Sequence, residues 1–167
     1  MGQYSVRKAA PSDFLEISAL DRTAWGTNRN SDFIPDGEHI WRLWVEYAYT
    51  YIAIDEDSGK IIGVNMAMPT NIDHMYFLHK IILDPAHRQK GAGSMLFDIM
   101  FAEMDAIGGT ICLTTDTNNV GMHKLCEKYG FSEKDNIKGY YRPEEDRLIL
   151  ERKPKNTKGL KSRLSLS

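Results

Sequence analysis

The stretch with the clearest chemical content is a short loop near the middle of the chain that joins a predicted strand to a predicted helix. It carries two cationic residues, Arg88 and Lys90, and two glycines, Gly91 and Gly93. Glycines let the backbone approach a ligand closely, and the first amides of a helix lack intrahelical partners and favour anions. The loop therefore predicts a phosphate site over residues 88–94. The alternative is an ordinary helix start with flexible glycines.

Other phosphate and metal sites are not indicated. A P-loop requires Gly-Lys followed by Ser or Thr, the dinucleotide fingerprint requires Gly-x-Gly-x-x-Gly, and the sequence contains neither. We expect no metal, because the scattered histidines offer no pair at metal-ligand spacing on one predicted helix. These histidines are His39, His74, His87 and His123.

Hydrophobic periodicity predicts the elements that position this loop. Alternating and β-branched runs predict strands at residues 4–9, 51–54, 61–68, 76–83, 110–115, 132–141 and 147–152. Helical spacing predicts one helix opened by Pro11 and others at about residues 38–47, 90–107 and 120–129. The helix at 90–107 has a predicted buried stripe of Ala92, Met95, Leu96, Ile99, Ala102 and Ala106. The order is an α/β (α+β) mixture with a strand–helix–strand crossover in its middle.

Length and composition fit one ordinary globular domain. The 167 residues are 42% hydrophobic and 26% charged, and no apolar run approaches the roughly 20 residues that cross a membrane. We expect one domain over residues 1–153 and a basic, flexible tail over residues 154–167. Cys112 and Cys126 form no Cys-x-x-Cys, and the N-terminus has no apolar signal segment. We therefore expect a reducing, cytoplasmic setting.

The net charge of −2 is unevenly distributed. Residues 152–167 carry six basic residues and no acidic one, which leaves −8 on residues 1–151. We expect no nucleic-acid partner, because the folded part lacks a basic footprint, and no membrane partner. Formation of a homodimer is an open alternative. The acidic body loosely suits a cationic amine as substrate.

Three segments carry a resemblance to a known family. Residues 88–93, Arg-x-x-Gly-x-Gly, resemble the pyrophosphate loop of the GNAT acyltransferase superfamily, and residues 83–85, Leu-x-Pro, resemble its lead-in. Residues 119–131, where an Asn opens a helix and Gly-Phe closes it, resemble the superfamily's other segment. Residues 140–146 resemble the end of ribosomal-protein alanine acetyltransferases. The resemblance covers roughly residues 3–153.

The resemblance implies a GNAT-like fold, with a mixed, mostly antiparallel seven-stranded sheet, a central splayed parallel strand pair and about four helices. It also implies acetyl-CoA as acyl donor, bound between those two strands, and no metal. The strand backbone would hold the pantetheine arm, and the amides of the glycine loop would hold the pyrophosphate. The acetyl-CoA-binding residues implied in this way are Ile81, Leu83, Arg88, Gln89, Lys90, Gly91, Gly93, Ser94 and Asn119.

The activity implied by the resemblance is N-acetyl transfer, in which a primary amine attacks the thioester directly in a ternary complex. The amine belongs to a small molecule, a protein N-terminus or a lysine. Such catalysis depends on positioning and on a backbone amide, at Leu83 by the resemblance, that polarises the carbonyl. Two proton transfers remain, one from the ammonium and one to the departing thiolate. The alternative is a non-catalytic acyl-CoA-binding regulatory module.

The base that many family members use is absent here. They place a Glu on the fourth strand, six residues before the Leu83 position, where this sequence has Phe77. His79 follows two residues later and shares the same face of the strand, and imidazole changes charge near neutral pH. We therefore predict His79 as the base. The alternative is a structural histidine packed in the sheet.

The usual general acid is absent as well. Many family members have Tyr where this sequence has Cys126. An ordinary thiol, with a pKa of about 8.5, is no stronger an acid than the leaving thiol. We therefore predict that Cys126 is a core residue and not the acid. Tyr140 and Tyr141, in the predicted strand 132–141, are the candidate acids, ahead of Tyr129.

Aromatic residues are dense in the first two predicted helices and the strand that follows them. In the family this region shapes the acceptor pocket, so the aromatic residues are either core packing or a wall for the acceptor. They are Trp25, Trp41, Trp44, Tyr47, Tyr49 and Tyr51.

Overall fold

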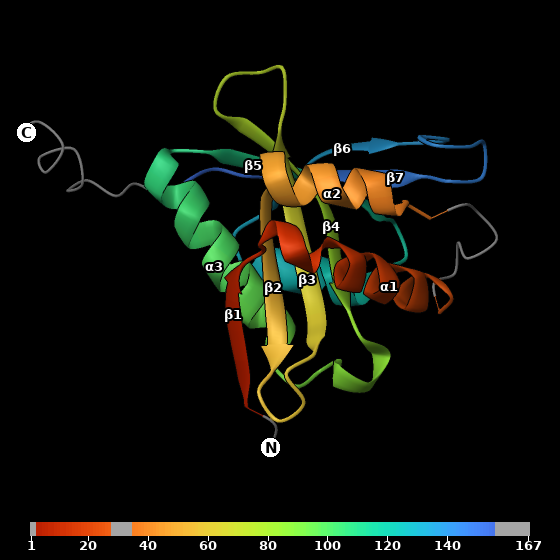
Figure 1. The fold of residues 1–167 in the computed structure, drawn as a ribbon. Coiled ribbons are helices and arrows are strands. Elements are labelled where there is room, and N and C mark those ends of the chain that lie inside the picture. Colours follow the sequence, from red (N-terminus) through yellow and green to blue (C-terminus); the bar gives the residue numbers. More distant parts are fainter. Residues whose placement is uncertain (1–2, 28–34, 156–167) are drawn as a thin grey trace, which may run out of the picture. The chain divides into compact units, whose positions relative to one another are not determined.

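The computed structural model describes residues 3–27 and 35–155. Most of the predicted basic tail, at residues 156–167, lies outside the described residues, as do residues 28–34. The strands in the described ranges are β1 (Tyr4–Lys8), β2 (Tyr49–Asp55), β3 (Ile61–Pro69), β4 (Met75–Leu83), β5 (Thr110–Asp116), β6 (Ser132–Ile137) and β7 (Arg147–Arg152), shown in Figure 1. The helices are η1 (Pro11–Asp13), α1 (Phe14–Trp25), α2 (Glu38–Tyr47), η2 (Pro85–His87), α3 (Ala92–Ile107) and α4 (Val120–Lys128).

The sheet confirms the predicted fold class. Its seven strands follow the order β1-β2-β3-β4-β5-β7-β6. The pairs β1–β2, β2–β3, β5–β7 and β6–β7 are antiparallel. The pair β4–β5 is parallel and joins Met75–Phe77 to Thr110–Cys112. The α3 helix connects these two strands, as a parallel pair requires.

The chain forms two compact units. The first comprises Met1–Met68 and Leu78–Phe101, and the second comprises Pro69–Phe77 and Ala102–Ser167. The boundary falls within β4 and within α3, so each of these elements contributes to both units. The single domain predicted over residues 1–153 stays a prediction, which a test for one cooperative unfolding transition would decide.

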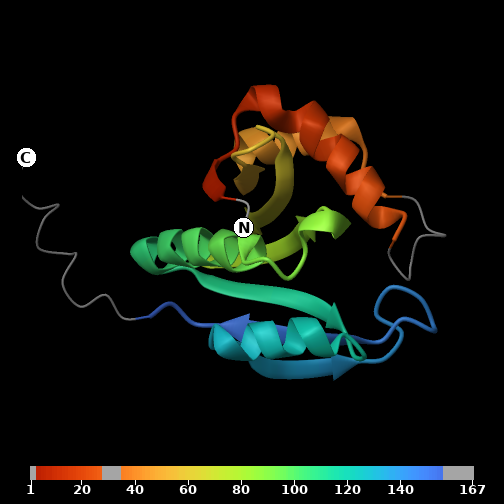
Figure 2. The same ribbon diagram turned by 90° about the horizontal axis from the view of Figure 1, so that it is seen from below.

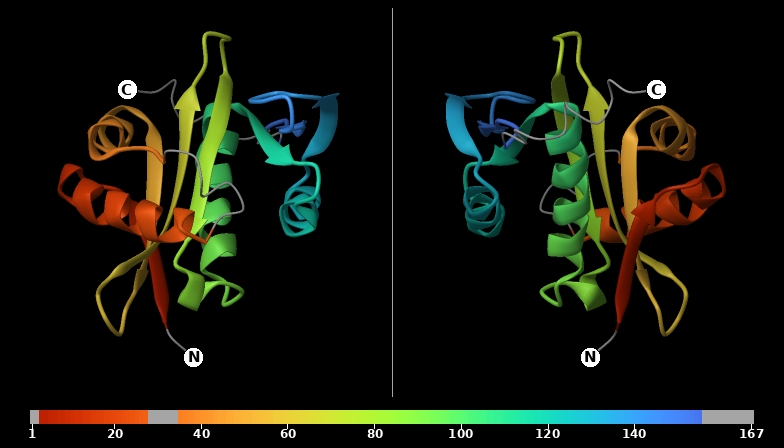
Figure 3. Two further views of the ribbon diagram at one scale, coloured as in Figure 1. Left: turned by 90° about the vertical axis from the view of Figure 1, so that its right-hand side faces the viewer. Right: turned by 90° about the vertical axis from the view of Figure 1, so that its left-hand side faces the viewer.

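In the first unit, β3 is covered on both faces. Figure 3 shows α1 and α2 on one side of β2 and β3 and the start of α3 on the other. The fully buried side chains of Val64 and Met66 join the cluster that α1 and α2 supply. Asn65, between them, faces the opposite way and donates its Nδ2–H to the backbone carbonyl of Leu96 at 2.7 Å. Burial on both faces explains why residues 61–68 form a nearly continuous apolar run.

The predicted buried stripe of α3 is wrong at its C-terminal end. Ala92 and Leu96 are buried as predicted, but Ala102 and Ala106 are exposed. Larger side chains set the buried face instead, because they remove more apolar area from water than a methyl group does. The buried face continues through Phe97, Met100, Phe101 and Met104.

In the second unit, one buried arginine joins three elements. Figure 2 shows α4 beside β6 and β7. Arg152 of β7 is 2% exposed, and its Nε–H donates to the carbonyl of Tyr129 just after α4 at 3.1 Å. Its two terminal nitrogens each lie 2.8 Å from the carboxylate of Asp105 on α3. This fork-like pairing fixes the ends of both helices to β7.

The predicted strand over residues 132–141 is too long, because β6 ends at Ile137. The backbone turns at Gly139, whose φ of +63° lies in the left-handed region that glycine tolerates. The amide of Tyr140 then donates to the carbonyl of Glu145 at 2.9 Å, which closes a loop. Both candidate acids therefore lie on the loop between β6 and β7, and not on the sixth strand.

Candidate active site

The glycine loop lies in the first unit, between β4 and α3. The α3 helix begins at Ala92, so Ser94 lies in its first turn. The backbone φ is +59° at Gln89 and +98° at Gly91. Positive φ is uncommon outside glycine, and left-handed residues in a turn are typical of the backbone nests in which successive amides bind an anion. The local backbone therefore suits the phosphate site predicted for this loop.

The two glycines of the loop have different surroundings. A Cβ atom added at Gly91 would meet nothing within 4 Å, whereas one added at Gly93 would lie 3.1 Å from a methyl carbon of Leu83. Gly93 therefore allows α3 to pack closely on β4. Gly91 leaves open space at the start of the helix, where a ligand could approach the backbone.

Arg88 and Lys90 are both exposed beside this loop. The Arg88 Nη2–H donates to Oγ1 of Thr27, just after α1, at 3.2 Å. Its Nε–H points to the carbonyl of Leu83 at 3.4 Å. The guanidinium thus lies between the ends of α1 and β4, where it adds positive charge near the loop.

The remaining predicted residues of the first unit lie on β4. Ile81 and Leu83 are half-buried. The side chain of His79 is 29% exposed, and its Nε2 lies 3.5 Å from Oδ2 of Asp36. Its ring centroid lies 5.0 Å from that of Trp44. The imidazole is therefore held between a carboxylate and an indole while it keeps some access to solvent.

Asp36 has two basic partners. Lys80 places its Nζ 2.5 Å from Oδ2 of Asp36 and 2.6 Å from Oδ2 of Asp21. Burial is the largest influence on the Asp36 carboxyl and raises its pKa, but the hydrogen bonds from His79 and Lys80, with their positive charge, together outweigh burial and lower the pKa to about 2. Asp36 is therefore ionised at neutral pH.

Sequence reasoning missed both Lys80 and Asp36. A lysine inside an otherwise apolar strand signals a buried charge that needs a partner, so the position of Lys80 could have revealed it. Asp36 gave no such signal, because it stands in a polar, turn-rich segment and its importance comes only from contacts made in three dimensions.

The aromatic residues of this region divide between core and surface. Trp41 and Tyr51 are buried, at 0% and 4% exposure, and serve the core. Tyr47 is 73% exposed. Trp44 stands edge-on to Trp41, with ring centroids 5.0 Å apart, and also contacts the imidazole described above. Trp44 is therefore the aromatic residue that flanks the candidate base.

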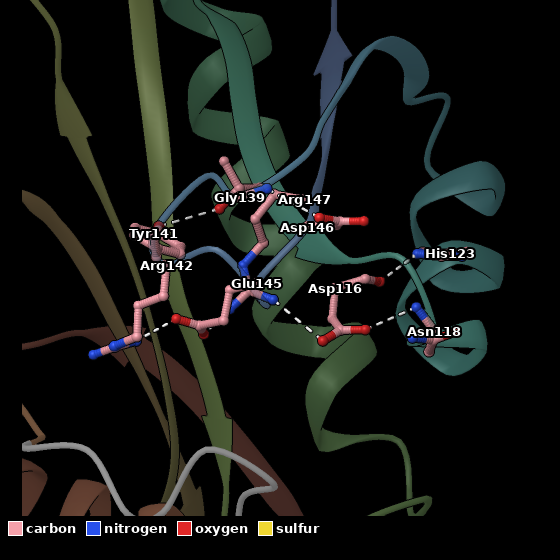
Figure 4. A network of polar contacts seen from close by, with 10 residues as sticks. Asp116, Asn118, His123, Gly139, Tyr141, Arg142, Glu145, Asp146 and Arg147 are labelled. Carbon is pink, nitrogen blue, oxygen red and sulfur yellow. Dashed lines mark hydrogen bonds and ion pairs between the residues drawn. The ribbon is translucent and has the colours of Figure 1, made fainter.

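Asn119, in the second unit, caps the start of α4. Its Oδ1 accepts the backbone N–H of Met122 at 3.1 Å, as an N-cap residue does. The Asp116 carboxylate accepts the backbone N–H of Asn118 at 2.8 Å, and the Asp116 carbonyl lies 2.9 Å from Nε2 of His123 (Figure 4). These bonds fix the turn between β5 and α4.

The two candidate acids form an exposed aromatic pair. Tyr140 and Tyr141 are 40% and 52% exposed, and their rings meet edge-to-face with centroids 4.7 Å apart. The hydroxyl of Tyr141 lies 3.4 Å from Oγ1 of Thr114. Its ring lies 5.1 Å from the guanidinium of Arg147, a cation–π distance.

An ion-pair network holds the loop that carries Tyr140 and Tyr141 to the end of β5 (Figure 4). Arg147 is its centre, with Nη1 3.3 Å from the Asp116 carboxylate and Nη2 3.2 Å from the Glu145 carboxylate. Glu145 also pairs with Arg142. Because the Glu145 side chain is only 9% exposed, this network is poorly screened and gives the loop a defined position.

Cys126 and Tyr129, the other residues considered as acids, serve the fold of α4. Cys126 is 2% exposed, and burial raises the pKa of its thiol to about 11. Such a thiol is a poorer proton donor than an ordinary one. Tyr129 closes the helix, and its backbone carbonyl accepts a hydrogen bond from Arg152. These environments support the prediction that neither residue is the acid.

The sequence matches a known protein family over most of its length. Residues 14–131 match the model of a family described as the acetyltransferase (GNAT) family. The match includes the glycine loop, His79 and Asn119. The chain belongs to the GNAT acetyltransferase family. The resemblance drawn from residues 83–93 and 119–131 is thereby confirmed.

Solved structures share the fold of this GNAT acetyltransferase. The ribosomal-protein-S18-alanine N-acetyltransferase of Escherichia coli has a TM-score of 0.77 at 18% identity, over 95% of this chain and 99% of that one. An N-acetyltransferase from Staphylococcus aureus Mu50 has a TM-score of 0.78 at 18% identity, over 92% and 99%. The yncA protein from Salmonella typhimurium, solved with its cofactor acetyl-CoA, has a TM-score of 0.77 at 14% identity, over 92% and 95%.

In its described residues, this GNAT acetyltransferase has neither a cluster of metal ligands nor a membrane-spanning helix. No curated protein sequence matches the chain. In the part of the chain that the structure describes, no three His, Cys, Asp or Glu residues come together to hold a metal ion. No helix among the described residues has the length and apolar character needed to cross a membrane.

Proposed function

We propose that this GNAT acetyltransferase moves the acetyl group of acetyl-CoA to a primary amine by direct attack in a ternary complex. The acceptor is a small amine, a protein N-terminus or a lysine. The observation that carries the proposal is the glycine loop, with left-handed backbone at Gln89 and Gly91 and open space beside Gly91. The structure of yncA with its cofactor acetyl-CoA supports the same donor here.

The residues proposed to bind the donor divide between the two units. In the first, the backbone of Ile81 and Leu83 pairs with the pantetheine amides, and the amides of residues 89–94 bind the pyrophosphate, with Arg88 as a nearby positive charge. In the second, Asn119 contributes from the start of α4. Acetyl-CoA supplies an activated thioester. The Leu83 amide polarises its carbonyl.

His79 is the proposed base and removes the proton from the acceptor ammonium. Its partial exposure, 29%, and the carboxylate beside it support this role over that of a core histidine. Tyr140 or Tyr141 is the proposed acid for the departing thiolate, because Cys126 is buried and its thiol pKa is raised to about 11. Trp44 flanks the base on the side of α2.

Substitutions test these proton-transfer roles. His79→Ala should lower kcat/KM by on the order of 10²-fold, the usual contribution of a positioned base. Tyr140→Phe and Tyr141→Phe each remove only a hydroxyl, and the variant that loses the acid should show a comparable fall in kcat. Steady-state rates with the best acceptor provide the measurement. Full activity in His79→Ala would make the base a water chain.

The second candidate function is a regulatory module that binds acyl-CoA without turnover. It is favoured by Phe77 in place of the usual Glu and by the buried Cys126 in place of the usual Tyr. Release of free CoA from acetyl-CoA, measured against a panel of small amines, peptides with free N-termini and lysine peptides, separates the two. Amine-dependent release establishes the transferase. Tight CoA binding with no release for any acceptor favours the module.

A further inference from the structure

The Asp36 carboxylate joins three elements of the first unit. Asp36 stands directly before the cap of α2, and the same oxygen, Oδ2, faces two consecutive residues of β4. It lies 2.5 Å from Nζ of Lys80 and 3.5 Å from Nε2 of His79. Lys80 in turn lies 2.6 Å from Asp21 on α1.

Buried neighbours hold this carboxylate in place. The side chains of Asp21 and Lys80 are only 2% and 11% exposed. Asp21 also accepts the indole N–H of Trp41 at 2.8 Å. The Lys80 ammonium lies 5.6 Å from the ring centroids of both Trp25 and Trp41. Because Lys80 is itself nearly buried and contacts a buried carboxylate and two indole rings, the lysine is a fixed anchor for Asp36.

The carboxylates of this cluster outnumber its ammonium groups. Two carboxylates, Asp21 and Asp36, share one ammonium, that of Lys80, so these three groups carry a net charge of −1. Charges that lie largely out of water require partners. The His79 imidazole on β4 also faces Asp36, with Nε2 3.5 Å from Oδ2.

We propose that Asp36 is a positioning residue for His79, which accepts the Nε2–H of the imidazole and stabilises the imidazolium that forms when His79 removes a proton from the acceptor. With its proton on Nε2, a neutral imidazole has its lone pair on Nδ1. The N–H bond of the acceptor ammonium breaks, its electron pair stays on the amine nitrogen, and the proton bonds to Nδ1. This inference rests on the proposed function, and specifically on His79 as base.

A cycle of variants separates positioning from a merely structural contact. Asp36→Asn keeps the size of the side chain and removes its charge. We expect kcat to fall by roughly tenfold to a hundredfold, less than the loss at the base itself, with little change in KM. Combined with His79→Gln, the same substitution should cause no further loss. Asp36→Glu, which keeps the carboxylate, should recover part of the rate.

The matched control is Glu38→Gln, two residues along the same segment. Glu38 forms an exposed ion pair with Arg22 at 3.1 Å, so this variant removes a similar charge and should leave the rate unchanged. Independent, multiplying losses from Asp36→Asn and His79→Gln would overturn the proposal. An equal fall of kcat in Glu38→Gln would also overturn it, because loss of any nearby negative charge would then explain the effect.

Nitrogen-15 spectra of the histidine side chains give a readout that needs no acceptor. The wild type should show the Nε2–H tautomer of His79, and Asp36→Asn should show a mixture. If Asp36→Asn does not fold, the Asp36 carboxyl can be titrated in His79→Gln, where its pKa should rise from about 2 because one hydrogen bond is lost. An unchanged tautomer or an unchanged Asp36 titration would refute the contact. These results stand even if no amine is acetylated, so they distinguish failure of this inference from failure of the proposed function.

Discussion

The left-handed backbone of Gly91 gives the sharpest test at the scale of a residue. Its φ is +98°, and a side chain there would point into open space. Gly91→Val should therefore block the approach of a diphosphate and leave the neighbouring packing intact. We expect calorimetry to show CoA affinity reduced by at least about tenfold, which corresponds to about 1.4 kcal/mol.

Gly59 provides the control for backbone strain. It lies in the turn between β2 and β3, also has a positive φ, +69°, and also has open space at its Cβ position. Gly59→Val should cost similar stability and leave CoA affinity at the wild-type value. A folded Gly91→Val variant with unchanged affinity would exclude the loop as the CoA site.

Burial of Cys126 predicts an inert thiol. Its pKa is raised to about 11 by burial, so almost none of it is thiolate at pH 8, and the thiolate is the reactive form. In a Cys112→Ala background, a thiol reagent at pH 8 should modify the chain only after denaturant is added. Cys126→Ala should lower kcat by less than about tenfold, against the 10²-fold or more lost with a true acid. A loss beyond a hundredfold with CoA affinity preserved would show that Cys126 takes part in the chemistry.

At the scale of elements, the sequence predicted those whose ends carry a local signal. The bounds of α2, Glu38–Tyr47, and of β7, Arg147–Arg152, are as predicted, because apolar spacing and flanking polar residues mark both ends. The end of β6 was missed because polar residues continue past Ile137 without a break in pattern, and only Gly139 marks the turn. Helical spacing also extends the predicted stripe of α3 through Ala102 and Ala106, which are exposed, because the larger side chains decide which face is buried.

The ion pair between Asp21 of α1 and Lys80 of β4, here called the tether, should contribute strongly to stability. Lys80→Met would leave the carboxylate of Asp21, 2% exposed, without its charged partner. Breaking a buried ion pair from one side costs about 3–5 kcal/mol, because an uncompensated charge stays buried. Urea unfolding followed by tryptophan fluorescence measures the loss.

An exposed pair supplies the comparison for Lys80. Lys153 contacts Glu151 at 3.1 Å with its own side chain 71% exposed, and surface pairs contribute about 0–1 kcal/mol. Lys153→Met should therefore change the free energy of unfolding little. Removing Asp21 together with Lys80 should cost less than the sum of the two single losses. Equal, small effects in Lys80→Met and Lys153→Met would show that the tether is not a buried ion pair.

At the scale of the whole molecule, motifs in the sequence indicate part of the candidate site. The glycine loop, the Asn119 cap and the family follow from residue types at fixed spacing. The surroundings of the candidate base do not, because Asp36 and Asp21 are 43 and 58 positions from His79 in the chain. A contact between such distant residues depends on how α1, α2 and β4 pack, and a single sequence shows no pattern for it.

Carboxyl groups with lowered pKa occur in both units and set the pH dependence of stability. The Asp13 pKa is lowered, chiefly by its hydrogen bond to Arg7. At Asp105, burial is the largest influence and raises the pKa, but the bonds from Arg152 and the Lys155 amide lower it overall. The Asp36 pKa falls from 3.8 to about 2.

The lowered pKa values determine how stability changes with pH. A carboxyl whose pKa is lower in the folded state stabilises the fold above its unfolded pKa, and that contribution is lost as pH falls through the folded value. For Asp36 the window runs from about pH 4 down to about pH 2. The fall of this pKa from 3.8 to about 2 corresponds to about 2.4 kcal/mol at most. Solvent screening reduces that figure because the Asp36 side chain is 31% exposed.

We therefore expect the urea midpoint to stay level from pH 7 to about pH 5 and to fall steeply between pH 4 and pH 2. Asp36→Asn should flatten this fall, because an amide does not titrate. At pH 6 the free energy of unfolding of the wild type should exceed that of the variant by up to about 2 kcal/mol. The two proteins should converge near pH 2. Glu38→Gln, which removes an exposed carboxyl, should follow the wild-type curve. A wild-type advantage that persists unchanged to pH 2 would mean that Asp36 stabilises the fold by packing and not by its ionised carboxylate.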